Sequence, residues 1–316
     1  MSTRHLPRAI GSRGKTALEI ERENFEKSQH VAITKAISAT ECPVKEKHAR
    51  STFKDHGAGL YWTIGGKLPL QGNPIIAWKF IHVLHKILRD GHPHAIPDSF
   101  KNHAILKELA KLWMHLKEGY GKLIACYCKL MVEKLNFHRK NKEIPGNLNL
   151  SDNSFLRFVG LMLIIIFGSL DMSRSNSMTN SGQCRLAPLI LCIQDSCQLY
   201  DYIVKSLFRL HSSLPPDTLS GHRDRFLSMY KRLKQFYLSS SNLQYFKNLV
   251  QVPGLPDEPP NFLIASDFSK HVKPVAVVPD EPEPEAEPEI EVEDLIDTSV
   301  SQPPVQVNNF GNGFPD

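Results

Sequence analysis

The acidic, proline-rich end of the chain most limits what the sequence can fold into. From residue 274 to residue 316 the chain carries 11 Asp and Glu residues and neither Lys nor Arg. This stretch has too few apolar side chains to offset the entropy lost on ordering, so we expect it to be disordered. The preceding 273 residues hold all 38 basic residues and 22 acidic ones, a net charge of +16. The sequence therefore predicts a basic folded body followed by an acidic linker, not one neutral globule.

Helix signals dominate the basic body. In the clearest segment Asn73 is a helix cap, Pro74 suits the first helical position, and an apolar stripe runs from Ile76 to Ile87. We expect Gly91 to end this helix in a left-handed conformation. The other segments with helical periodicity are 17–27, 31–40, 45–53, 105–116, 122–137, 187–210, 217–238 and 242–250.

Strand signals are weak by comparison. No stretch shows sustained alternation of apolar and polar residues, and the short run 275–278 lies among prolines, so we expect it to be extended linker. The sequence therefore predicts an all-α stacked array or solenoid, with helices of about 10–20 residues and short Gly/Pro loops.

Two features bear on where such a chain works. The apolar run FVGLMLIIIFGSL (158–170) has 13 residues, fewer than the roughly 20 that span a bilayer, so a buried core helix is favoured over an interfacial segment. The six cysteines are scattered, without a C-x-x-C pair, which indicates reduced thiols in the cytosol. The N-terminus is charged, lacks an apolar core and so does not resemble a secretory signal.

Catalytic and metal-binding motifs are missing from the sequence. It holds no nucleophile elbow, phosphate-binding loop or dinucleotide fingerprint, so we predict that the chain is not an enzyme and needs no cofactor. Among 14 histidines, His82 and His85 lie three apart on one predicted helix, and His92 and His94 follow. No carboxylates or thiolates at the usual spacing join them, so we interpret His82 and His85 as hydrogen-bonded helix residues and predict no metal site.

The corner on either side of Pro43 holds the most informative basic cluster. Lys35 lies near the end of one predicted helix, and Lys45, Lys47 and His48 lie at the start of the next. They can meet across the corner, where a helix start adds free amides, so the pattern favours a ligand with several phosphates. On a regular helix Lys47 lies about 200° from Lys45, so the ligand would have to straddle the loop and first turn. From spacing alone, a solvated charged surface is the alternative.

A family resemblance favours the phosphate site. Lys35, nine residues, Lys45, one residue, Lys47 and His48 match K-x9-K-x-[KR]-[HY], which resembles the phosphoinositide-binding motif of the ANTH family, the N-terminal domains of clathrin assembly proteins. Longer strings are similar to its huntingtin-interacting branch: VKEKHAR (44–50), WKFIHVLHKILRDGHP (78–93), EGYGKL (118–123), PGNLNLSD (145–152), GQCRLAPLI (182–190), LPPDTLSGHRDRF (214–226), SSNLQYFK (240–247) and PPNFL (259–263). SLDMSRS (169–175) is more similar to the founding member of that branch than to its paralogue.

The resemblance implies both a fold and a function. It implies an ANTH domain over residues 17–273, a right-handed superhelix of about 8–10 helices, after a flexible N-terminus (1–16). It implies a cytoplasmic adaptor of clathrin-mediated endocytosis, peripheral at clathrin-coated pits and vesicles, with phosphoinositides, clathrin and actin as partners. Residues 1–16 lack a strong apolar stripe, so we expect docking on the surface without deep insertion.

The chain also departs from the family pattern. Residues 151–168 replace a longer polar stretch and core helix, which puts the middle of the array in doubt. The sequence stops before the family's coiled coil and talin-like module, to which dimerisation and most clathrin and actin contacts belong. Residues 294–298, DLIDT, resemble a clathrin box, but Thr298 and Ser299 occupy positions where an apolar residue and an acid are expected.

Two other functional classes compete with the adaptor. A helical protein-interaction scaffold, or an isoform that has lost lipid binding, would share every helix signal. The +16 body could instead suit nucleic acid, but the sequence shows neither a basic groove interleaved with aromatic residues nor a recognition helix, so we predict no nucleic-acid partner.

Overall fold

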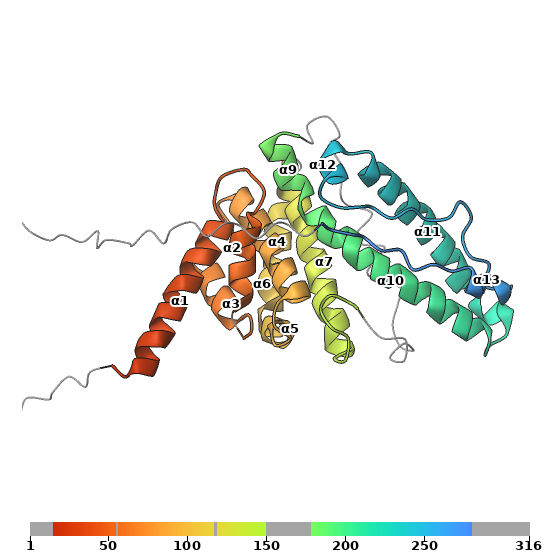
Figure 1. Cartoon of the computed structure of the whole chain (residues 1–316), viewed down its shortest axis with the longest axis horizontal. Helices are drawn as coiled ribbons and strands as arrows, with labels where there is room; N and C mark the ends of the chain where they lie inside the picture. Colours follow the sequence, from red (N-terminus) through yellow and green to blue (C-terminus); the bar gives the residue numbers. More distant parts are fainter. Residues whose placement is uncertain (1–14, 55, 117–118, 150–177, 280–316) are drawn as a thin grey trace, which may run out of the picture. The chain divides into compact units, whose positions relative to one another are not determined.

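The computed structural model describes residues 15–54, 56–116, 119–149 and 178–279, and in these ranges it is helical (Figure 1). The helices are α1 (Ala17–Ala36), α2 (Glu46–Ser51), α3 (Gly59–Gly65), α4 (Pro74–Asp90), α5 (Ala95–Ser99), α6 (His103–Met114), α7 (Gly121–Lys140), α9 (Asn180–Leu186), α10 (Pro188–His211), α11 (Ser220–Ser241), α12 (Gln244–Lys247) and α13 (Ser266–Ser269). Short 3-10 turns are η1 (Thr52–Lys54), η2 (Phe100–Asn102) and η5 (Pro216–Leu219). The predicted all-α class is confirmed.

Several predictions fall outside these ranges. They concern the N-terminal segment up to residue 14, the whole of the atypical apolar segment, and the acidic chain from residue 280, including the clathrin-box-like sequence. The predicted domain limits also stay predictions. Within the described ranges, no helix is both long and apolar enough to cross a bilayer.

Helix α4 shows which local signals held and which one failed. Asn73 accepts hydrogen bonds from the amides of Ile75 and Ile76, and Pro74 occupies the first helical turn, as predicted. The prediction for Gly91 was wrong, because its φ of −82° is not left-handed. Glycine is required there by a close approach instead, since a Cβ would lie 2.5 Å from the carbonyl oxygen of Ile87.

The sequence predicted two helices, 17–27 and 31–40, in the region where the structure has the single helix α1. It is one continuous helix that starts at a capping box, in which Thr16 and Glu19 each bond the other's backbone amide. No glycine or proline separates the two predicted halves, so nothing in the sequence interrupts the backbone bonding.

The core is centred on α4, which is buried over most of its surface. Trp78 of α4 donates its indole N–H to the carbonyl of Cys184 on α9, at 2.8 Å. Tyr61 of α3 donates to the carbonyl of Phe80 at 2.6 Å, and the two rings stack. Helices α6 and α7 form a hairpin beside α4. These contacts make α4 the element against which the N-terminal and C-terminal helices both pack.

The C-terminal part of the described chain returns along α10 and α11 (Figure 1). Phe262 packs against Phe208 of α10 and Phe226 of α11. Val277 pairs with Gln251 in an isolated antiparallel bridge, the one β feature of the described ranges. The run 275–278, predicted to be extended linker, therefore includes a residue that is bonded to the helical body.

Candidate functional site

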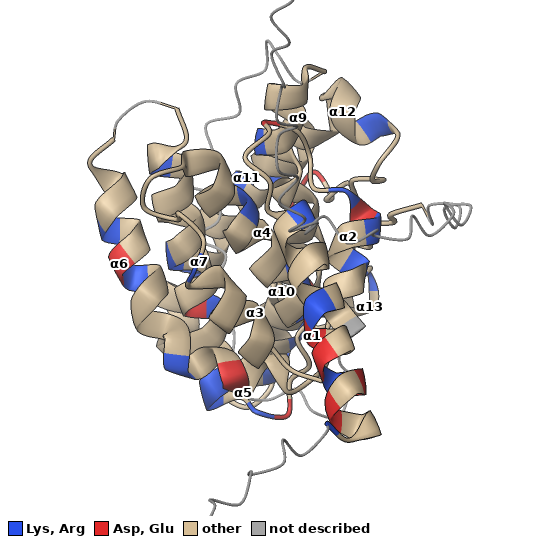
Figure 2. Cartoon of the chain, turned by 90° about the vertical axis from the view of Figure 1, so that its left-hand side faces the viewer, with Lys and Arg blue, Asp and Glu red and all other residues tan. Residues whose placement is uncertain are grey.

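The four predicted basic residues flank one connection. Lys35 is exposed in the last turn of α1, and Lys45 is exposed at the N-cap of α2. Lys47 and His48 follow in the first turn of α2 and are half-buried. Helices α1 and α2 pack together, so the connection 37–44 closes on itself and brings its two ends to one corner. Figure 2 shows Lys and Arg where α1 meets α2, with acidic residues beside them, whereas the other half of α1 carries Asp and Glu interspersed with Lys and Arg.

A buried lysine holds this connection in place by hydrogen bonds. Lys79 of α4 is 2% exposed, and its ammonium donates to the hydroxyl of Ser38 at 3.0 Å and to the carbonyl of Thr40 at 2.7 Å. The Sγ of Cys42 lies 3.8 Å from the same nitrogen. A buried ammonium bonded to three points of one loop holds that loop in a single conformation. The spacing of Lys35 and Lys45 is therefore set by α4.

Glu41 ties the same connection to two other elements. Its Oε1 accepts from the hydroxyl of Tyr120, which precedes α7, at 2.9 Å and from that of Ser181 on α9 at 2.5 Å. Arg185 of α9 lies 3.5 Å from this oxygen, and its guanidinium also stacks over the Tyr120 ring. The hydroxyl of Ser181 is the largest cause that lowers the pKa of Glu41, which therefore stays ionised.

Helix α2 is fastened on both sides. Gln29 of α1 donates to the carbonyl of Ser51 at 2.9 Å, and Lys86 of α4 pairs with Glu46 at 2.5 Å. Glu41 and Glu46 are the only acids between Lys35 and Arg50, and each has a cation partner outside this stretch. Neither acid is therefore left to cancel the positive field of the exposed Lys35 and Lys45. Because α2 has only six residues, the side chains and not its dipole must supply most of that field.

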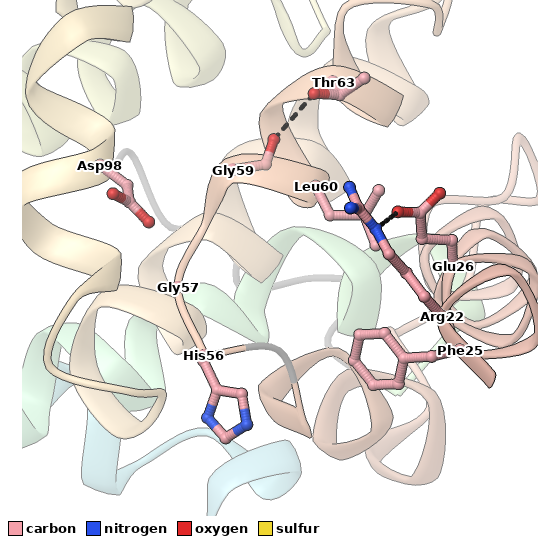
Figure 3. Close-up of a pocket in the computed structure, with 9 residues that line it drawn as sticks. All are labelled: Arg22, Phe25, Glu26, His56, Gly57, Gly59, Leu60, Thr63 and Asp98. Atoms are coloured by element: carbon pink, nitrogen blue, oxygen red, sulfur yellow. Dashed lines mark hydrogen bonds and ion pairs between the residues drawn. The ribbon is translucent and has the colours of Figure 1, made fainter. Parts of the chain in front are cut away.

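A pocket of about 560 Å³ opens on another part of α1 (Figure 3). It is lined by Arg22, Phe25, Glu26, His56, Gly57, Gly59, Leu60, Thr63 and Asp98. Its charges already have partners, since Arg22 pairs with Glu26 at 2.9 Å and Asp98 accepts from the amide of Ala58 at 3.0 Å. None of the four predicted site residues lines it, so it is separate from the basic corner.

Sequence reasoning missed a charged cluster in the interior. Asp195 of α10 is 1% exposed, and its Oδ2 accepts from His85 at 2.9 Å and from Lys134 of α7 at 2.6 Å. Its Oδ1 accepts from Arg89, and Tyr127 bonds the far nitrogen of His85 at 2.9 Å. Helical periodicity places Lys134 and Asp195 on apolar faces, the one sequence signal that could have exposed this cluster.

Electrostatics in this cluster fix its protonation. Burial lowers the pKa of His85 to about 4, so the imidazole is neutral at pH 7. Burial alone would raise the pKa of Asp195, but Lys134, His85 and Arg89 together hold it well below its usual range. Asp195 is therefore a carboxylate, and Nε2 of His85 is the donor to it. His82 is buried nearby in α4, and the described residues contain no group of three or more side chains suited to a metal ion.

Three comparisons place the chain among known proteins. Residues 28–271 match the model of the ANTH domain family. The chain is 47% identical to human Huntingtin-interacting protein 1 over 98% of its own length and 32% of that protein. It is 39% identical to Huntington interacting protein related 1 of Caenorhabditis elegans, over 81% of this chain and 30% of that one. The chain thus spans about a third of the length of these relatives.

A solved structure shows the same fold at lower identity. The ENTH domain of epsin-2, determined in complex with phosphatidylinositol 4,5-bisphosphate, superposes with a TM-score of 0.63 at 24% identity. The match covers 74% of this chain and 98% of that domain.

Proposed function

The chain belongs to the ANTH domain family, and on that premise we propose that it docks on phosphoinositide membranes through Lys35, Lys45, Lys47 and His48. The observation that carries the proposal is the fastened corner. The connection between the first two lysines is held by Lys79, and Glu41 within it and Glu46 just after it pair with cations elsewhere, so the exposed Lys35 and Lys45 are presented without a rearrangement.

The strength of this docking follows from the number of charges. Each basic residue near an anionic leaflet contributes about 1 kcal/mol, so four contacts give reversible docking. The phosphates of the headgroup add to this because they stand closer together than the charges of ordinary anionic lipids. Lysine reads phosphate as a point charge, so the corner by itself gives little discrimination between phosphoinositide isomers.

Docking of this kind suits an adaptor. A yeast relative, Endocytosis protein end4 of Schizosaccharomyces pombe, is 29% identical over 77% of this chain and 24% of that protein. We propose that this chain is the membrane-binding part of an adaptor of clathrin-mediated endocytosis, peripheral at coated pits. Its links to clathrin and actin would lie mostly in regions of the longer relatives that have no counterpart here.

Vesicle co-sedimentation tests the site. Vesicles with and without phosphatidylinositol 4,5-bisphosphate are mixed with wild type and with Lys35→Glu/Lys45→Glu. We expect the wild type to pellet with the phosphoinositide vesicles and the variant to remain in the supernatant. The matched control is Lys101→Glu/Lys142→Glu, which makes the same charge change at two exposed lysines. Lys101 lies just before α6 and Lys142 just after α7.

Two outcomes would contradict the proposal. Equal pelleting of wild type and the corner variant would remove the site assignment. A folded wild type, shown helical by circular dichroism, that binds neither vesicle would favour the protein-interaction scaffold instead.

A further inference from the structure

Glu41 is an acid that lies inside the basic corner, between its two exposed lysines. It follows Lys35 by six residues and precedes Lys45 by four. A carboxylate at this place opposes the attraction of the corner for phosphate. Counting charges alone therefore predicts that its removal strengthens the binding of an anionic headgroup. The contacts of the side chain lead to the opposite expectation.

The carboxylate of Glu41 joins its connection to two other parts of the fold. Its Oε1 accepts from the hydroxyl of Tyr120, which directly precedes α7, at 2.9 Å and from the hydroxyl of Ser181, in the first turn of α9, at 2.5 Å. Hydrogen bonds to an ionised acceptor are stronger than those between neutral groups. They therefore hold the middle of the connection against both elements.

The charge of Glu41 is compensated within the fold. The guanidinium of Arg185 lies 3.5 Å from Oε1, and it stacks over the ring of Tyr120 at 4.8 Å from the ring centroid. The hydroxyl of Ser181, with smaller contributions from Tyr120 and Arg185, lowers the pKa of Glu41, so the side chain is a carboxylate at pH 7. Its negative charge takes little from the field of the corner, whereas its hydrogen bonds fix the shape of the corner.

The connection 37–44 depends on such side-chain bonds. Its backbone is irregular, with neither helix nor strand, so no regular backbone bonding fixes its course. Lys79 holds it at the carbonyl of Thr40, at 2.7 Å, and Glu41 holds it at the next residue. The relative position of the two exposed lysines at its ends therefore follows from these bonds.

We propose that Glu41 is a positioning residue for phosphoinositide binding, which holds Lys35 and Lys45 at the spacing that one headgroup requires. This inference rests on the proposed function and adds to it a residue whose charge has the wrong sign for direct contact with phosphate. Only the fraction of molecules with the correct spacing binds the headgroup tightly, so loss of this tether lowers the apparent affinity.

Glu41→Ala separates positioning from charge counting. Charge counting predicts about fivefold tighter binding, the value of one unit of charge at an anionic surface. Positioning predicts roughly three- to tenfold weaker binding of inositol 1,4,5-trisphosphate, measured by calorimetry. Glu143→Ala, which removes an exposed acid just after α7, is the matched charge control and should bind like wild type. A Glu41→Ala protein that binds this headgroup as tightly as wild type, or more tightly, would overturn the inference.

Two kinds of vesicle separate positioning from a loss of fold. On phosphatidylserine vesicles without phosphoinositide the attraction is diffuse and requires no fixed spacing, so Glu41→Ala should bind at least as well as wild type. On vesicles that also contain phosphatidylinositol 4,5-bisphosphate it should bind more weakly. A variant that binds both kinds of vesicle more weakly and unfolds at a lower temperature would show that Glu41 serves stability alone, which would also overturn the inference.

Conservative variants identify the bonds that matter. Glu41→Gln keeps an oxygen that can accept from Tyr120 and Ser181, so it should recover most of the headgroup affinity that Glu41→Ala loses. Tyr120→Phe and Ser181→Ala each remove one donor without a change of charge, and each should weaken headgroup binding about two- to threefold. Unchanged binding in both donor variants, with no recovery in Glu41→Gln, would contradict the positioning role.

The behaviour of wild type decides the proposed function separately. Wild type that binds neither inositol 1,4,5-trisphosphate nor phosphoinositide vesicles would refute the proposed function, and with it any positioning role. Wild type that binds both, together with Glu41→Ala that binds both equally well, would refute the role of Glu41 and leave the proposed function standing.

Discussion

The cluster around Asp195 and the corner between α1 and α2 contain the same residue types, lysine and histidine. In the cluster these side chains are buried and paired, whereas two of the corner's lysines are exposed. Lys134 and His85 are almost completely buried against one carboxylate, and every charge in that cluster has a partner within the fold. Lys35 and Lys45 are exposed at the ends of one connection, and the nearby Glu41 and Glu46 pair with other cations. The difference teaches that residue type does not separate scaffold from site in this protein. Burial and pairing do.

The largest effect should come from the interior. Asp195→Ala leaves Lys134 and Arg89 buried without their anion, so we expect the free energy of unfolding to fall by about 3–5 kcal/mol. Urea unfolding followed by circular dichroism measures this. The control is Asp257→Ala, which removes a fully exposed carboxylate paired with Lys234 and should leave the unfolding midpoint unchanged. A loss below 1 kcal/mol for Asp195→Ala would show that the cluster is not structural.

Acidification should weaken the same interior. In the unfolded chain a histidine binds a proton below about pH 6.5, whereas the pKa of His85 in the fold is about 4 and that of His138 about 3, both because of burial. Between pH 6.5 and pH 4 the unfolded state therefore binds more protons, and stability falls by roughly 1.4 kcal/mol per pH unit for each histidine. Urea unfolding at pH 7 and pH 5 checks this.

A variant identifies the histidine responsible. His85→Gln should have a smaller loss of stability between pH 7 and pH 5 than wild type, whereas His30→Gln, at an exposed position on α1, should keep the wild-type slope. Parallel slopes for all three proteins would contradict the assignment.

Lys79 lies on α4, the helix that also carries His85 and Arg89, and its replacement should show an intermediate effect. Lys79→Met keeps the buried hydrocarbon but leaves the Ser38 hydroxyl and Thr40 carbonyl without their donor, so we expect a loss of about 1–3 kcal/mol in stability. Vesicle binding should also weaken, although Lys79 is too buried to touch lipid. Lys129→Met, at an exposed position on α7, is the control for both measurements. Unchanged vesicle binding would show that the connection does not need to be fixed.

The smallest effect on stability belongs to the corner itself. Lys35→Gln and Lys45→Gln should each change the free energy of unfolding by less than about 0.5 kcal/mol, because both side chains are exposed. Each should weaken binding to phosphoinositide vesicles about fivefold, the value of one basic residue at an anionic surface. Thermal unfolding and vesicle titration on the same samples give both numbers. A stability loss comparable to that of Asp195→Ala would remove the distinction between the two regions.

The sequence was a good guide where structure is local. The helices predicted at 105–116 and 187–210 lie at His103–Met114 and Pro188–His211, because apolar periodicity and flanking Gly or Pro are written into neighbouring residues. Gly91 shows the limit of such rules. Glycine after a helix suggests a left-handed stop, but the structure needs it for a close backbone approach.

The candidate site also has a part that the sequence predicted and a part that it did not. Its four residues could be chosen from a motif, and that choice remains a prediction for the vesicle experiment. The groups that hold these four residues in place could not be predicted from the sequence. Lys79 bonds a loop about 40 residues away, and Tyr120 bonds Glu41 across 79 residues. Nothing in the spacing of one segment reveals a partner so distant along the chain.

By itself, the sequence determined the helical class, the basic body with its acidic end, and the motif that marks the corner. Only the tertiary structure decided which charges are interior and paired, as at Asp195 and His85, 110 residues apart, and which are presented at an edge. The physical reason is that helix formation depends on neighbouring residues, whereas the cost of burying a charge is decided by the partners that folding brings to it.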